Sequence, residues 1–148
     1  MLIPSLPLIS VGKSWVVGPE KNRKNYALIG NFAFHEAGYF LYHLDSDGFL
    51  YSIQDVKRVP LAELTLEDRF TLLLYDLFNG KGRWGWAHYQ YSEKRQLSLD
   101  EAKAFLVEQA LRVNWRWKAN GPLIREFEDR ISSARTTLEL INVSISLG

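Results

Sequence analysis

The chain has 148 residues, with 18 Lys and Arg against 17 Asp and Glu, so its formal net charge is +1. Apolar residues make up 47% and charged residues 24%, which is the balance of a globular protein and excludes a disordered tail. The absence of cysteine excludes a disulfide scaffold, a thiolate zinc site and a cysteine nucleophile. A near-neutral chain is also not expected to bind nucleic acid mainly through its charge.

The length predicts a single domain over 1–148, strand-rich over 13–59 and helix-rich over 65–141. No stretch approaches the ~20 apolar residues that span a bilayer, so we expect no contact with a membrane. The amino end, 1–11, is apolar but is interrupted by prolines and lacks a basic start, so no secretory signal is expected. With no signal and no cysteine, the expected location is the cytoplasm.

The first half of the chain has the alternation typical of β-strands. A short β-prone run covers 14–17, and apolar residues recur at every second position over 26–34, 39–44 and 49–53. Between the last two runs, Asp45-Ser46-Asp47-Gly48 is typical of a hairpin turn, because Asp bonds to nearby backbone and Gly adopts positive φ. This half therefore predicts an antiparallel meander.

The second half predicts helices. Thr65 can cap the first helix, which ends at Gly80 and has one apolar face made of Leu66, Phe70, Leu73, Leu74, Leu77 and Phe78. Ser98 and Glu101 have the spacing of a capping box and begin the second helix. Apolar spacing of three and four over 124–141 predicts a third helix.

The end of the chain alternates again at Val143, Ile145 and Leu147, which indicates a final short strand. Strands that come first and helices that come afterwards are typical of the α+β class. We therefore predict an antiparallel β-meander of three to five strands with about three helices packed on one face.

The most unusual segment, 81–95, lies between the first two predicted helices. It gathers basic and aromatic side chains, namely Arg83, Trp84, Trp86, His88, Tyr89 and Tyr91. As a strand, this segment would place Trp84, Trp86 and His88 on one face and the two tyrosines on the other. Trp115 and Arg116 form a second cluster late in the second predicted helix.

These eight residues are the predicted partner-binding residues. Trp, Tyr and Arg dominate protein interfaces because rigid side chains bury much area at a small loss of entropy. The alternative interpretation is structural, since a small sheet-and-helix domain can bury most of these rings.

Three short motifs match ligand-binding patterns only in part. Residues 80–85 match G-x-G-x-x-G, but a predicted helix precedes them, so a helix cap and a tight turn are favoured over phosphate binding. Gly12-Lys13-Ser14 lacks the first glycine and the following helix of a Walker A loop. Asp45 to Gly48 lacks the remaining oxygen ligands of a calcium loop. We therefore expect no cofactor.

The three histidines, His35, His43 and His88, lack the helical spacing of a metalloprotease. Structural histidines are therefore favoured over a metal site. No G-x-S-x-G elbow occurs, and the acidic residues near the first predicted helix are explained by its dipole. No catalytic or metal-binding residue is predicted, although a small enzyme that uses His88 or His35 stays an alternative.

The favoured hypothesis is a non-enzymatic protein-binding domain. A small, cysteine-free, aromatic-rich α+β chain resembles many bacterial immunity and antitoxin proteins in general build, without sharing diagnostic residues. That resemblance implies a toxin as the partner, neutralised by steric occlusion. The near-neutral charge does not favour a basic nuclease, which would be attracted by an acidic partner. The less favoured alternative is single-stranded RNA or DNA held by Arg and stacked aromatic rings. In that alternative, the basic runs at 21–24, 81–83 and 112–118 would form one stripe on the surface despite the near-neutral total charge.

Overall fold

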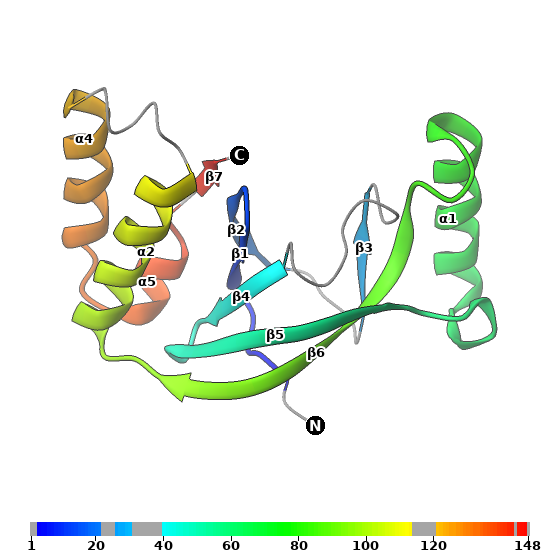
Figure 1. Cartoon of the computed structure of the whole chain (residues 1–148), viewed down its shortest axis with the longest axis horizontal. Helices are drawn as coiled ribbons and strands as arrows, with labels where there is room; N and C mark the ends of the chain where they lie inside the picture. Colours follow the sequence, from blue (N-terminus) through cyan, green and yellow to red (C-terminus); the bar gives the residue numbers. More distant parts are fainter. Residues whose placement is uncertain (1–2, 22–25, 31–39, 114–120, 144, 148) are drawn as a thin grey trace.

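The computed structural model describes residues 3–21, 26–30, 40–113, 121–143 and 145–147. Over these residues the chain is α+β, and its strands form one seven-stranded antiparallel sheet in the order β3-β6-β5-β4-β1-β2-β7 (Figure 1). The strands are β1 (Leu8–Gly12), β2 (Val16–Glu20), β3 (Ala27–Ile29), β4 (Phe40–Asp45), β5 (Phe49–Arg58), β6 (Gly85–Gln96) and β7 (Ile145–Leu147). The helices are α1 (Leu66–Asn79), α2 (Leu99–Val113), α4 (Gly121–Ser132) and α5 (Thr137–Ile141), with a short 3-10 helix, η2 (Leu61–Glu63).

The predicted fold class is confirmed, but the prediction of three to five strands is too low for the part of the chain described here. One additional strand is β6, which lies inside the half that was expected to be helix-rich. The other is β1, which pairs with β2 on one side and with β4 on the other. Its residues Leu8, Ile9 and Val11 are fully buried. A strand buried on both faces shows little alternation between apolar and polar residues, so the pattern that marks the other strands is weak in β1.

The helices begin where the capping residues predict, but one predicted helix is divided. In α2 the capping box is formed, because the Ser98 N–H donates to the Glu101 carboxylate at 3.0 Å and the Glu101 N–H donates to Ser98 Oγ at 3.1 Å. The predicted third helix is split into α4 and α5 at Thr136. The Thr136 hydroxyl accepts from the Glu139 N–H at 3.1 Å and caps α5. The predicted final strand is confirmed as β7, which pairs with β2.

Helices α2, α4 and α5 lie together at one end of the sheet, and α1 stands at the opposite end (Figure 1). The main core lies between the sheet and helices α2, α4 and α5. It includes Leu44, Leu50, Leu106 and Ile131. The prediction that the helices pack together on one face therefore describes α2, α4 and α5 but not α1. Among the described residues, none of the helices has the length and apolar character of a membrane span.

The two longest strands connect these two ends of the molecule. Strands β5 and β6 pair antiparallel from Phe49 with Gln96 near the core to Arg58 with Ala87 near α1. Because η2 and α1 are inserted between β5 and β6 in the chain, this two-stranded ribbon places α1 far from the core (Figure 1).

Candidate protein-binding surface

Helix α1 begins and ends where the sequence predicts. Thr65 is its N-cap, with the hydroxyl accepting from the Asp68 N–H at 3.2 Å. Gly80 follows the last turn with φ +95°, a conformation that glycine adopts without strain, and its N–H donates to the Asp76 carbonyl at 3.2 Å. Gly82 also has positive φ, and β6 follows directly. The G-x-G-x-x-G string is therefore a helix cap and a turn, as predicted.

Polar and aromatic groups attach α1 to the sheet. Asp68 is almost fully buried, and its carboxylate accepts a hydrogen bond from the Tyr26 hydroxyl. This hydrogen bond, together with desolvation, raises the pKa of Tyr26 above its usual value of 10.0. Trp86 Nε1 donates to the Asp68 carbonyl at 3.0 Å, and the rings of Tyr75 and Trp84 lie 4.6 Å apart between centroids. These contacts hold the inner side of α1 against β3 and β6.

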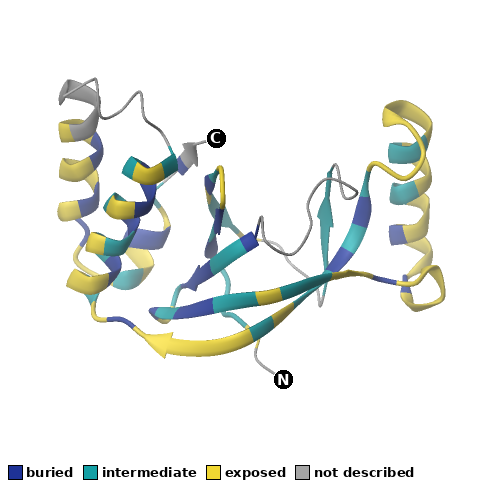
Figure 2. Cartoon of the chain, viewed as in Figure 1, coloured by how far each residue is buried: buried dark blue, intermediate teal, exposed yellow. Residues whose placement is uncertain are grey.

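The opposite side of α1 faces solvent (Figure 2), and its large side chains are apolar. Its exposed fractions run from 40% for Leu74 to 81% for Leu66, and Phe78 is 78% exposed. We call this surface the outer face of α1, and it consists of Leu66, Phe70, Leu73, Leu74, Leu77 and Phe78. It is the same apolar stripe that the sequence shows.

An outward apolar stripe is unusual, because a surface helix of a globular protein normally packs such a stripe on the core. Exposed apolar patches of several hundred Å² on a soluble chain mark interaction surfaces. Each Å² of apolar surface left in water costs roughly 25 cal/mol relative to burial, so a partner that covers this face is favoured by the hydrophobic effect.

The predicted aromatic segment mostly supports α1 and the sheet. Trp84 and Trp86 are half-buried between α1 and the strands, whereas Arg83 is exposed beside the end of the helix. The ring of Tyr26 contacts both Trp86 and His88, at 5.2 and 5.9 Å between centroids. The predicted sharing of one strand face is therefore confirmed for Trp86 and His88, whereas Trp84, which was expected on the same face, precedes β6.

The two tyrosines of this segment lie on the other side of β6, against β4. The Tyr91 hydroxyl is 2.7 Å from Nδ1 of His43, and the ring of Tyr89 lies 4.6 Å from the His43 ring between centroids. His43 is fully buried, as a hydrogen-bonded structural histidine would be. Trp115 and Arg116 lie outside the described residues, and a partner-binding role for the segment stays a prediction.

Of the two histidines named in the enzyme alternative, His88 lies in the described part of the chain. His88 Nε2 lies 3.9 Å from the Glu63 carboxylate, with the His88 side chain half-buried and the Glu63 side chain exposed. Among the described residues, no group of three or more His, Asp or Glu is placed to hold a metal ion. His35 lies outside the described residues.

Of the basic residues invoked for nucleic-acid binding, Arg112 has a structural role. Its guanidinium donates to the Gly12 carbonyl at 2.7 Å and to the Lys13 carbonyl at 2.8 Å, which joins α2 to the end of β1. Most of the basic runs at 21–24 and 112–118 lies outside the described residues. A basic stripe on the surface therefore stays a prediction.

A cleft of about 780 Å³ opens between the β2 and β3 sides of the sheet. Its lining is largely apolar and aromatic, with Trp15, Phe40 and Trp84 among its walls and Glu20 as the charged side chain. Apolar walls of this kind do not by themselves specify a ligand, because specificity needs several convergent polar groups.

The chain was compared with protein-family models, with curated proteins and with solved structures, and none of them matches. The outer face of α1 is a candidate binding surface that the sequence analysis did not single out. Its apolar stripe is visible in the sequence, but the same stripe would serve equally well for packing on a core.

Proposed function

We propose that this protein is a small non-enzymatic protein-binding domain and that the outer face of α1 is its binding surface. The observation on which the proposal rests is the exposure of this face, with Leu66, Leu77 and Phe78 each about three-quarters or more exposed. Leucine and phenylalanine side chains gathered on one helix face match the apolar centre of protein interfaces.

The charge of α1 favours a protein partner over nucleic acid or lipid. The helix contains Glu67, Asp68 and Asp76 against the single basic residue Arg69. Nucleic acids and anionic membranes attract helices that are rich in Lys and Arg, so an acidic helix suits neither.

The attachment of α1 also suits binding. Because Asp68, Trp86 and the Tyr75–Trp84 ring contact hold the inner side of the helix, its outer face is already ordered. When a partner docks, this chain therefore loses little conformational entropy, which is the general advantage of preorganised surfaces. When the partner is a different protein, the specific function that we propose is neutralisation of a toxin by steric occlusion.

The experiment places a photo-crosslinking amino acid at Leu77 in the chain expressed in its native cells. We expect a predominant protein adduct, because this position lies within the outer face of α1. The matched control places the same probe at Glu108, which is exposed on α2 at the other end of the molecule. Equal adducts from both positions, or no protein adduct from Leu77, would contradict the proposal. Expression of a partner recovered this way, with and without this chain, tests the toxin hypothesis. We expect the partner to be toxic alone and to lose its toxicity on co-expression with this chain.

A further inference from the structure

The partner of the outer face of α1 follows from the charges of this helix and from the spacing of its apolar residues. We infer that the face is covered by a second copy of this chain, with the two α1 helices packed antiparallel about a two-fold axis. This inference rests on the proposed function, because it names the occupant of the same surface. A two-fold interface requires one patch that is complementary to itself, and three observations show that α1 has such a patch.

The first observation is the spacing of the apolar residues. Leu66, Phe70, Leu73 and Leu77 follow one another at intervals of four, three and four residues, which is the spacing of a helix-to-helix seam. In an antiparallel pair centred on this seam, Phe70 meets Leu73 of the second copy, and Leu66 meets Leu77. All four side chains are at least 61% exposed, so the seam is open along its length.

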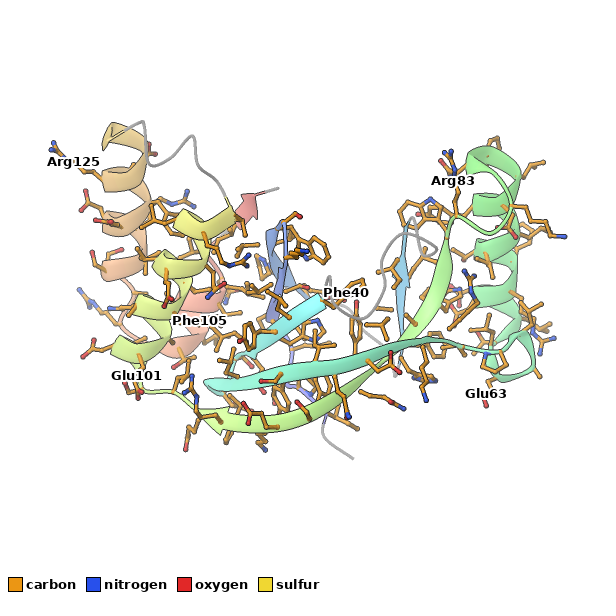
Figure 3. All side chains as sticks on the ribbon, in the orientation of Figure 1. Phe40, Glu63, Arg83, Glu101, Phe105 and Arg125 are labelled. Atoms are coloured by element: carbon orange, nitrogen blue, oxygen red, sulfur yellow. The ribbon has the colours of Figure 1, made fainter. Side chains whose placement is uncertain are left out.

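The second observation is that the two ends of α1 carry opposite charges. Glu63 and Glu67 are exposed at its start, and Lys81 and Arg83 are exposed just beyond its end. Arg69 near the start and Asp76 near the end each offset one charge, so the start remains net acidic and the end net basic. Figure 3 shows Glu63 and Arg83 at opposite ends of the helix. An antiparallel pair brings the acidic end of each copy to the basic end of the other and also opposes the helix dipoles. A parallel pair brings like charges together, so the charges select the antiparallel arrangement.

The third observation is the size of the patch. With their exposed fractions, the side chains of the outer face present on the order of 700 Å² of mainly apolar surface. This is close to the ~800 Å² that each partner contributes to an interface of standard size. Helix α1 lies at the edge of the molecule with its exposed side turned away from the sheet (Figure 2), and the outer face belongs to that exposed side, so a second copy can approach it.

The absence of native cysteine allows a direct test of both the dimer and its orientation. One chain carries Leu66→Cys, and a second, distinguishable by a tag, carries Leu77→Cys. We expect a disulfide-linked pair when the two chains are mixed and oxidised, and no linked pair from either chain alone. Linkage of each variant with itself would overturn the antiparallel arrangement.

The mass in solution provides the second measurement. By light scattering, we expect the unsubstituted chain to have twice its chain mass of 17.1 kDa at micromolar concentration. Leu73→Glu should raise the dimer dissociation constant by about tenfold or more, because it places a charge at the centre of the interface. The matched control is Leu138→Glu on α5, where a leucine is 49% exposed outside the patch, and it should leave the dimer unchanged.

A monomeric chain at these concentrations would overturn the inference. The proposed function would still stand if the Leu77 photo-crosslink identified a different protein, so the two failures are distinguishable. A dimer that dissociates equally in both Glu variants would also overturn the inference, because its interface would then lie elsewhere.

Discussion

At the scale of single residues, Asp45 shows how one buried carboxylate organises a turn. Asp45 is fully buried at the end of β4. Its Oδ1 accepts from the N–H groups of Asp47 and Phe49 at 3.0 and 2.9 Å, and its Oδ2 accepts from the Ser5 N–H at 3.0 Å. The carboxylate therefore joins the β4–β5 hairpin to the amino-terminal segment before β1.

This geometry predicts a graded loss of stability. Asp45→Ala leaves three backbone N–H groups without their acceptor and should lower the free energy of unfolding by about 2–4 kcal/mol. Asp45→Asn keeps the oxygen that serves the turn but places an NH₂ group toward Ser5, so it should cost about half as much. Urea denaturation of both variants measures this difference, and equal losses would show that the turn contacts contribute nothing beyond the Ser5 contact.

At the scale of elements, α1 and α2 have similar apolar stripes but different environments. Leu106 of α2 is fully buried in the main core, whereas Leu77 of α1 is 74% exposed. The stripe of α2 therefore stabilises the fold of the single chain, whereas the outer face of α1 does not.

We accordingly expect the same Leu→Ala substitution to have a large effect on stability in α2 and a small effect in α1. Leu106→Ala should lower the free energy of unfolding by about 2–5 kcal/mol, because it leaves a cavity in a packed core. Leu77→Ala should change it by less than about 0.5 kcal/mol when measured in solutions dilute enough for the chain to be monomeric. A loss at Leu77 comparable to the loss at Leu106 would mean that the outer face of α1 is packed within the chain.

At the scale of the whole molecule, the ribbon of β5 and β6 separates the main core from α1. Elements with few buried apolar contacts open at lower free energy than the core does. Association of two copies through α1 stabilises the folded chain as a whole by mass action, and it also covers α1 directly. Amides of α1 that exchange by local opening of this helix should therefore become more protected at higher protein concentration, whereas amides of α2 that exchange by local fluctuations within the core should not.

Amide hydrogen exchange tests this expectation. Protection of α1 amides that exchange by local opening should increase as the protein is concentrated through the dimer dissociation constant, while protection of α2 amides that exchange by local fluctuations stays constant. Leu73→Glu is the control, because it should remove the concentration dependence without exposing α2. No concentration effect on the locally exchanging α1 amides, or an equal effect on the locally exchanging α2 amides, would contradict association through α1.

Local features were predictable from the sequence because short-range bonds decide them. The caps at Thr65 and Ser98, the stop at Gly80 and the hairpin at Asp45 to Gly48 each depend on atoms within a few residues of one another. The fold class followed from the order of strands and helices. The division of the third helix at Thr136 was missed, because its apolar spacing continues across the break.

The sequence by itself determined which side chains form the apolar face of α1, since a period of 3.6 residues places them on one side of any helix. Only the tertiary structure decided that this side faces solvent. The orientation of α1 is set by hydrogen bonds from residues distant in the sequence. Tyr26 and Trp86 donate to Asp68 and so attach the opposite side of the helix to the sheet. The place of β1 between β4 and β2 was decided in the same way, by pairing with β4, which lies about 30 residues further along the chain. The hydrophobic pattern of a sequence shows that one face of a helix is apolar, whereas long-range contacts determine what covers that face.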